Sequence, residues 1–297
     1  MSPLGIGTWA WGDRLFWGYG RGYADEDIQG AFRASLEAGI NFFDTAEVYG
    51  FGRSEKFLGQ FAAGAEQNPV IATKFFPYPW RLTKGSLLRA ARGSVKRLRV
   101  RQIDLYQLHW PTPPVSVETW MSAMADAVEA GLVRLVGVSN CNVELTRRAH
   151  AALAARGIPL ASNQIEYNLL HRQPERNGLI ETCRELGVTV IAYSPLAMGV
   201  LTGKYTPDNP PSGYRGMQYK RELLARVQPL IALLREIGEK HGGKTPAQVA
   251  INWVICKGAV PIPGAKNARQ ARDNAGAMGW RLTDDEVAVL DSASEGF

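Results

Sequence analysis

The chain has 297 residues, 45% of them hydrophobic and 21% charged, which is enough to bury a large core and excludes a disordered chain. Its net charge of +6 is small and its basic residues are scattered without interleaved aromatics, so we expect no nucleic-acid partner. Three well-separated cysteines, no apolar run of about 20 residues and no signal sequence together predict a cytoplasmic protein without membrane association.

Eight short apolar segments along the chain are typical of β-strands. Most are continuously apolar, as parallel strands are when both faces are covered, and amphipathic segments with helical spacing lie between them. The expected strands cover residues 4–8, 40–44, 70–74, 103–109, 134–138, 160–164, 188–193 and 259–262.

Capping residues mark where several of the expected helices begin and end. Asp25 is a candidate N-cap of the first helix, and Gly39 would close that helix. Thr245 is followed by a proline, which predicts another helix start. The sequence Thr-Asp-Asp-Glu at 283–286 fits a capping box before the last helix. A basic cluster at 84–101 has helical spacing and indicates a solvated helix face.

The alternation of strands and helices predicts a single (β/α)8 TIM barrel, one domain over residues 1–297, rather than a doubly wound sheet. The interval between the last two strands is more than twice as long as the others. It holds a Pro/Gly-rich stretch at 203–216 and a helical pattern at 219–240, so we expect a long loop and an extra helix over the barrel mouth. The chain lacks G-x-G-x-x-G, Walker and zinc-ligand spacings, so neither a Rossmann site nor a metal is expected.

Four ionisable side chains stand at or just after the ends of consecutive strands. Asp44 ends the second strand and Tyr49 follows it by five residues, while Lys74 and His109 end the next two strands. Because the C-terminal ends of barrel strands face one mouth, these side chains can converge there. Each alone is readily explained as a helix cap or a core residue, but the four together favour a catalytic site.

These four groups match the needs of carbonyl reduction by hydride transfer. The developing alkoxide needs a proton donor, and a tyrosine with a pKa of about 10 works poorly near neutral pH unless a neighbouring ammonium lowers that pKa. We therefore expect Lys74 to lower the pKa of Tyr49, Asp44 to hold Lys74 charged, and His109 to bind the substrate oxygen. A Schiff-base role for Lys74, as in barrel aldolases, needs a neutral amine, which an adjacent Asp44 disfavours.

Short motifs at the ends of the expected strands carry a further indication. They are Gly-Thr-Trp (7–9), Asn-Phe-Phe-Asp-Thr-Ala-Glu-Val-Tyr-Gly (41–50), Thr-Lys (73–74), Leu-His-Trp (108–110), Gly-Val-Ser-Asn (137–140), Asn-Gln-Ile-Glu-Tyr-Asn (163–168), Tyr-Ser-Pro-Leu-Ala (193–197), Gly-Lys-Tyr (203–205) and Ile-Pro-Gly-Ala-Lys-Asn (262–267). In combination they resemble the aldo-keto reductase superfamily over nearly the whole chain, particularly its plant-plastid and cyanobacterial members related to potassium-channel β-subunits. The resemblance implies NADPH-dependent reduction of aldehydes and ketones, with Asp44, Tyr49, Lys74 and His109 as the catalytic tetrad and Tyr49 as proton donor.

The resemblance also implies which residues hold NADP(H). Ser139, Asn140 and Gln164 would hydrogen-bond the nicotinamide carboxamide, which suits their amide and hydroxyl groups, and Tyr193 would stack on the ring. The rest of the implied set is Thr8 and Trp9 after the first strand; Ser194, Pro195, Leu196, Gly199, Lys204 and Arg215 around the pyrophosphate; Gly264, Lys266 and Gln270 at the 2′-phosphate; and Asp273 and Asn274 at the adenine.

The segment after the eighth strand favours NADP over NAD. No acidic residue lies between Gly264 and Arg272 to accept a free 2′-hydroxyl, and Lys266 and Arg269 make the segment positive. Gln270 departs from the family, which often has a basic residue there, and this weakens the expected preference.

The implied substrate is a small carbonyl compound held in an aromatic mouth. Trp9, Tyr49, His109 and Trp110 would line it, with Trp11, Trp17 and Tyr19 of the first loop as further candidates. Such a mouth suits apolar or aromatic carbonyls, and pyridoxal, small aldehydes and quinone-like compounds are all possible substrates.

An alternative function is that of an NADP(H)-binding, redox-sensing subunit with slow turnover, similar to channel β-subunits. The sequence leaves the oligomeric state open.

Two further expectations concern a cysteine after the fifth strand and the start of the chain. Cys141 follows the fifth strand and is expected to be a buried, unreactive thiol. The resemblance implies a short N-terminal hairpin that closes the bottom of the barrel. Because the first strand is expected from residue 4, we expect that closure to be absent or built differently.

Overall fold

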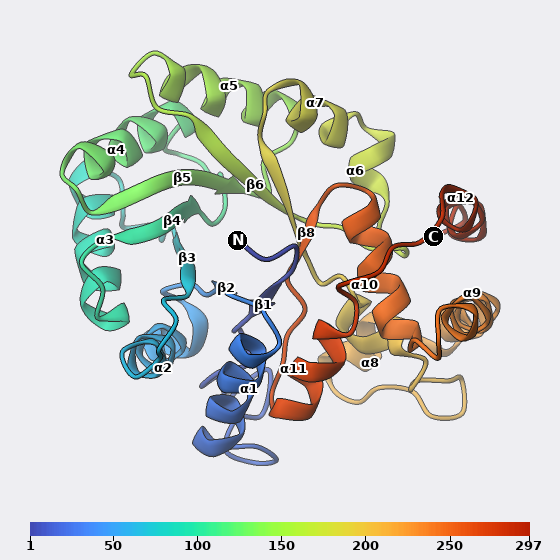
Figure 1. Cartoon of the computed structure of the whole chain (residues 1–297). Helices are drawn as coiled ribbons and strands as arrows, with labels where there is room; N and C mark the ends of the chain where they lie inside the picture. Colours follow the sequence, from blue (N-terminus) through green and yellow to red (C-terminus); the bar gives the residue numbers. More distant parts are fainter.

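The computed structural model describes the backbone of all 297 residues and every side chain except that of Tyr214. Eight parallel strands follow one another around a barrel in chain order, so the predicted (β/α)8 architecture is confirmed (Figure 1). The strands are β1 (Gly5–Gly7), β2 (Phe42–Asp44), β3 (Val70–Phe75), β4 (Ile103–Leu108), β5 (Val133–Ser139), β6 (Leu160–Glu166), β7 (Thr189–Tyr193) and β8 (Val260–Pro261).

The barrel closes between its first and last strands. The backbone N–H of Gly7 donates to the carbonyl of Pro263 over 3.1 Å, and Gly7 also pairs with Gly264. Inside the barrel, a small apolar cluster forms a floor, while the outer faces of the strands pack against the helices. The floor consists of Phe42, Ala72, Leu105, Ile191 and Ile262. Polar side chains of the upper strand ends therefore lie directly above an apolar interior.

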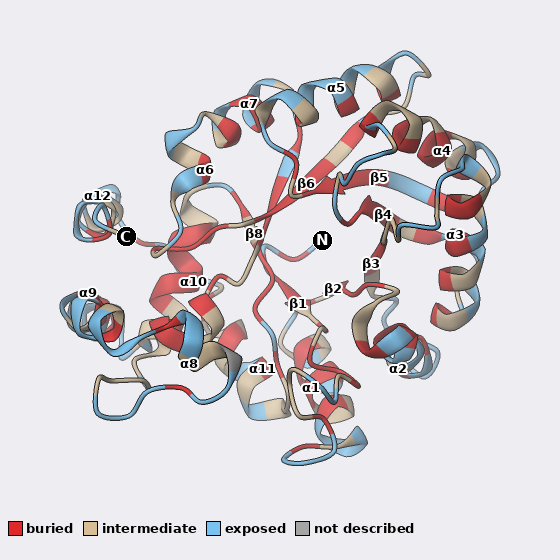
Figure 2. Cartoon of the chain, turned by 180° about the vertical axis from the view of Figure 1, so that it is seen from behind, coloured by how far each residue is buried: buried red, intermediate tan, exposed pale blue. Residues whose placement is uncertain are grey.

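The helices surround the barrel, and Figure 2 shows their buried sides toward the strands and their exposed sides outward. They are α1 (Asp25–Glu37), α2 (Arg53–Ala62), α3 (Lys84–Leu98), α4 (Val117–Glu129), α5 (Val143–Ala154), α6 (Gln173–Arg176), α7 (Leu179–Glu185), α8 (Tyr214–Gln218), α9 (Arg221–Lys240), α10 (Pro246–Cys256), α11 (Ala268–Ala275) and α12 (Asp284–Ala293), with the 3-10 turns η1 (Tyr49–Gly52) and η2 (Ala197–Thr202). In the part of the chain that is described, no helix has the length and apolar character needed to span a bilayer.

The predicted helix caps are mostly confirmed. Thr245 and Thr283 both begin their helices with complete capping boxes, and α3 covers residues 84–98 of the basic cluster. The prediction of Asp25 as N-cap is wrong by one residue. Ala24 is the N-cap, and its N–H donates to Asp27 Oδ2 over 2.9 Å. The Asp25 carboxylate instead accepts a hydrogen bond from Tyr19, because the first loop folds back over the start of the helix.

The long interval between β7 and β8 contains η2, α8 and α9, so the predicted loop and extra helix are confirmed. α9 occupies Arg221–Lys240, close to the expected 219–240. At the other end of the barrel, the N-terminal residues lie over its centre in both views (Figures 1 and 2). Ser2 exchanges two hydrogen bonds with Asn41 there, over 2.8 and 3.1 Å, which fixes the start of the chain to the entry of β2.

Candidate active site

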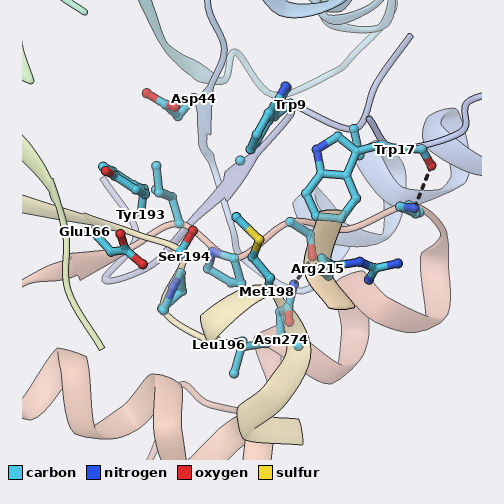
Figure 3. A pocket seen from close by; sticks show the side chains of 18 of the residues that line it. Trp9, Trp17, Asp44, Glu166, Tyr193, Ser194, Leu196, Met198, Arg215 and Asn274 are labelled. Carbon is cyan, nitrogen blue, oxygen red and sulfur yellow. Dashed lines mark hydrogen bonds between the residues drawn. The ribbon is translucent and has the colours of Figure 1, made fainter. Parts of the chain in front are cut away.

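A cavity of about 820 Å³ opens at the C-terminal ends of the strands. It runs from the ends of β2 and β4, past β5, β6 and β7, to the segment after β8, and η2 and α8 border it. Figure 3 shows Asp44 and Trp9 toward one end, and Arg215 and Asn274 toward the other. A cavity of this size and position is typical of barrel enzymes.

A buried ion pair lies at the floor of this cavity. Lys74 Nζ is 2.5 Å from Asp44 Oδ1 and donates to the carbonyl of Thr45 over 2.8 Å. The exposed fractions of the Lys74 and Asp44 side chains are 0% and 2%. Both residues point into the barrel because they continue the inward-facing alternation of β3 and β2 above the apolar floor.

Tyr49 and His109 complete the cluster above this ion pair. Lys74 Nζ lies 5.1 Å from the centroid of the Tyr49 ring. The ring of His109 meets Tyr49 edge-on with the ring centroids 5.8 Å apart, and Trp9 stacks on Tyr49 with the centroids 5.9 Å apart. The structure thus brings together the four ionisable residues that the sequence placed at or just after the ends of three consecutive strands.

The pKa of Tyr49 is shifted in the direction opposite to the one expected from the sequence. We predicted that Lys74 lowers the pKa of Tyr49, but desolvation in the cavity, with the negative charge of Asp44 second, raises the pKa of Tyr49. Burial likewise lowers the pKa of Lys74, although Asp44 and then Glu55 oppose that change. Burial and the charge of Lys74 hold the pKa of His109 well below its usual value. Tyr49 is therefore a protonated phenol and His109 a neutral imidazole near neutral pH.

The predicted carboxamide-binding groups form one connected network facing the cavity. Asn140, in a left-handed conformation with φ of +58°, donates through Nδ2 to His109 O over 3.2 Å and to Ser139 Oγ over 3.0 Å. Its Oδ1 accepts from the Tyr193 hydroxyl over 3.1 Å. Gln164 lines the cavity too, but its Nε2 donates to Asp44 Oδ2 over 2.7 Å. Hydroxyl and amide groups of this kind can hold a neutral amide ligand.

Three cations converge at the opposite end of the cavity, where we expected the phosphates. Lys266 Nζ donates to the backbone oxygen of Trp17 over 3.1 Å and lies 4.9 Å from its ring, and Arg215 lies over the same ring at 5.6 Å (Figure 3). Burial, followed by the charges of Arg215 and Lys204, lowers the pKa of Lys266 to about 8. An anion bound between these cations would relieve their repulsion.

The segment after β8 forms the last part of the cavity wall. The backbone N–H of Lys266 donates to Gln270 Oε1 over 2.8 Å, and Asn274 Nδ2 donates to the carbonyl of Gly264 over 3.3 Å. Asp273 is oriented by Gln248, whose Nε2 donates to both its carboxylate and its carbonyl. All of the residues predicted here for the 2′-phosphate and the adenine border the cavity, as do Ser194, Pro195, Leu196, Gly199, Lys204, Arg215 and Trp110.

Three of the residues expected at the site do not border the cavity. Thr8 is fully buried and does not border the cavity, because its hydroxyl donates to the Asp44 carbonyl over 3.0 Å and contacts Ser54 Oγ at 2.7 Å. Trp11 donates to Ala265 O over 2.8 Å in the core, and Tyr19 packs against neighbouring aromatic rings. Of the first-loop candidates, Trp17 alone reaches the cavity wall among the described side chains.

Several other residues of the cavity wall are not among those predicted from the sequence. Glu166 could have been found, since it stands two residues after Gln164 in the same strand and so faces the same side. Tyr205 belongs to the Gly-Lys-Tyr motif but was not assigned a role. Met198 and Gln218 come from the long insertion, where periodicity carries no signal about which side chains point inward.

The chain matches the model of the aldo/keto reductase family over residues 3–295. A chloroplastic pyridoxal reductase from Arabidopsis thaliana is 45% identical over 99% of this chain and 84% of its own length. The structure of a glycerol dehydrogenase from Gluconobacter oxydans is 27% identical with a TM-score of 0.87, covering 99% of this chain and 91% of its own. An aldo/keto reductase from Klebsiella pneumoniae, crystallised with NADP and acetate, is 29% identical with a TM-score of 0.76, covering 98% and 91%. The chain belongs to the aldo/keto reductase family.

Proposed function

We propose that this protein reduces aldehydes and ketones with NADPH, and that Tyr49 donates the proton to the carbonyl oxygen. The observation that carries the proposal is the cluster at the cavity floor. There, a protonated phenol stands beside a neutral imidazole and above the buried Lys74–Asp44 pair. The cluster supplies an acid, a hydrogen-bonding group for a carbonyl oxygen, and a cation close to the acid.

The residues of the cavity fit NADP(H) at both ends. The amide and hydroxyl network of Ser139, Asn140 and Gln164 would hold the carboxamide, with Tyr193 against the ring. Lys204 and Arg215 would hold the pyrophosphate and Lys266 the 2′-phosphate, and the positive charge of Lys266 supports NADP(H) over NAD(H). When bound, the cofactor supplies the hydride.

The roles of the chain's own side chains follow from their protonation states. His109 would donate its ring N–H to the carbonyl oxygen as a neutral imidazole, since its pKa is held low by burial. The Tyr49 hydroxyl would pass its proton to the oxygen as that atom becomes an alkoxide, a far stronger base than a phenolate. Lys74, 5.1 Å from the ring centroid, would then stabilise the phenolate left behind.

We further propose aromatic aldehydes, and pyridoxal first among them, as substrates. Trp9, Tyr49, His109 and Trp110 border the mouth, and Phe16 stacks on Trp9 at 4.6 Å, so the wall is largely aromatic. The pyridoxal reductase at 45% identity points to the same substrate class. We also propose that the protein is located in the cytoplasm.

The test is steady-state kinetics with a panel of aldehydes and ketones, run with NADPH and NADH side by side. We expect multiple turnovers with NADPH and an aromatic aldehyde. The variant Tyr49→Phe should lose at least about a thousandfold in kcat, while its NADPH affinity changes by less than about threefold. Equal loss of turnover and cofactor affinity would contradict Tyr49 as the acid. Tight NADPH binding without sustained turnover would favour the alternative of a redox-sensing subunit.

A further inference from the structure

A glutamine outside the predicted tetrad lies in the same buried polar layer. Gln107 is in β4, two residues before His109, and its side chain is fully buried. By strand register it stands beside Lys74 of β3 and Gly137 of β5. Leu105, one inward-facing position below it in the same strand, belongs to the apolar floor. The polar atoms of Gln107 therefore have partners only in the layer above that floor.

Gln107 shares the carboxylate of Asp44 with two other donors. Gln107 Nε2 donates to Asp44 Oδ2 over 3.2 Å, and Gln164 Nε2 donates to the same oxygen over 2.7 Å. Lys74 Nζ lies 2.5 Å from the other carboxylate oxygen, Asp44 Oδ1. A buried ion pair is stable only when the remaining lone pairs of its carboxylate are satisfied, because each buried charge has lost its water. The two amides supply those hydrogen bonds.

The barrel also makes room for this arrangement at Gly137. A Cβ atom built at Gly137 would lie 3.0 Å from Gln107 Cγ and 2.4 Å from Ser162 Oγ. Glycine at this position therefore lets the Gln107 side chain lie across the barrel toward β2. Gln107 Oε1 in turn accepts from Gln164 Nε2 at 3.5 Å, so the two amides and Asp44 form one network.

We propose that Gln107 is a positioning residue for the reduction: it fixes the carboxylate of Asp44, and through it holds Lys74 beneath the Tyr49 ring. The inference rests on the proposed function, because Lys74 needs to be held there only if Tyr49 is the proton donor. Gln107 itself does not border the cavity and acts through Asp44. It also keeps Gln164 Nε2 turned toward Asp44, which leaves Gln164 Oε1 to accept from an amide ligand.

The first test compares Gln107→Met, which keeps the length and removes the donor, with Ser162→Ala. Ser162 lies on the same interior layer, and its hydroxyl has no hydrogen-bond partner among the described residues, so it serves as a matched control. We expect Gln107→Met to lower kcat with an aromatic aldehyde about 10- to 100-fold, with KM within about threefold, as befits loss of a hydrogen bond to a charged group. Ser162→Ala should keep the kcat of the unsubstituted chain.

A second variant separates positioning from simple packing. In Gln107→Glu the introduced carboxyl faces Asp44 of β2, Lys74 of β3 and Gln164 of β6, with Tyr49 and His109 above. A protonated carboxyl can donate to Asp44 as the amide does, whereas an ionised one repels it. We expect kcat near that of the unsubstituted chain at acidic pH and a loss of at least about tenfold as the carboxyl ionises, over a range where the unsubstituted chain changes little.

The outcomes separate this inference from the proposed function. If the unsubstituted chain shows no turnover with any carbonyl, the proposed function fails. If it turns over while Gln107→Met keeps its kcat, or while Gln107→Glu follows the unsubstituted pH profile, the positioning role is overturned. A lower melting temperature in both Gln107 variants with unchanged kcat would likewise overturn it, because that result assigns Gln107 to packing alone.

Discussion

Lys266 should make NADPH binding depend on pH in a way that NADH binding does not. Its ammonium is partly buried beside Arg215 and Lys204, and burial first, then those charges, lowers its pKa to about 8. A dianionic 2′-phosphate placed beside it would favour the charged ammonium and return its pKa toward the ordinary value of about 10.4. Binding of NADPH would therefore be coupled to uptake of a proton by Lys266.

The sign and size of the effect follow from these two pKa values. Below pH 8 the ammonium is already charged in the free protein, so the affinity is constant. Above pH 8, binding must first protonate Lys266, and the Kd for NADPH rises by up to about tenfold per pH unit, or about 1.4 kcal/mol. Between pH 7 and pH 9 we expect a rise of about tenfold in Kd.

Fluorescence titration at constant ionic strength measures this dependence, and the salt must be fixed because it screens the same charges. NADH lacks the 2′-phosphate and should show a flat profile over the same pH range. The variant Lys266→Met should bind NADPH more weakly at pH 7 and lose the slope above pH 8. An equally flat profile for NADPH, or a slope that survives in Lys266→Met, would refute the placement of this ammonium at the 2′-phosphate.

Three further predictions concern charge, capping and thiols. Lys74→Met should destabilise the fold by about 3–5 kcal/mol by leaving Asp44 buried without its cation, and calorimetry with a Lys74→Arg comparison checks this. Thr283→Ala removes the capping box of α12 and should cost about 1 kcal/mol, or about 2–4 °C in Tm, with kcat unchanged. Thiol titration of the native protein should detect at most Cys256, because the other two cysteines are buried, whereas all three thiols should react in denaturant. Rapid reaction of more than one thiol in the native protein would contradict that burial.

The barrel and the main cluster could be predicted from the sequence because both follow from local pattern. Continuous apolar runs such as those of β3 and β4 identify parallel strands, and strand ends share one mouth in a barrel. Asp44, Lys74 and His109 could therefore be placed together without coordinates. The cap at Ala24 could not, because aspartate is a far better N-cap than alanine, and only the folded first loop engages the Asp25 carboxylate elsewhere.

What the sequence by itself determined is that Asp44, Lys74 and His109 reach the barrel mouth, since that depends on strand ends and the alternation of side chains. Only the tertiary structure decided what surrounds each of them. Desolvation and the charge of Asp44 raise the pKa of Tyr49, opposite to the expected effect of Lys74. Thr8 turns to Asp44 and Ser54 instead of the cavity, and Gln107 reaches Asp44 across the barrel. The burial of a side chain and its hydrogen-bond partners depend on neighbours from distant strands, and no local sequence pattern records those neighbours.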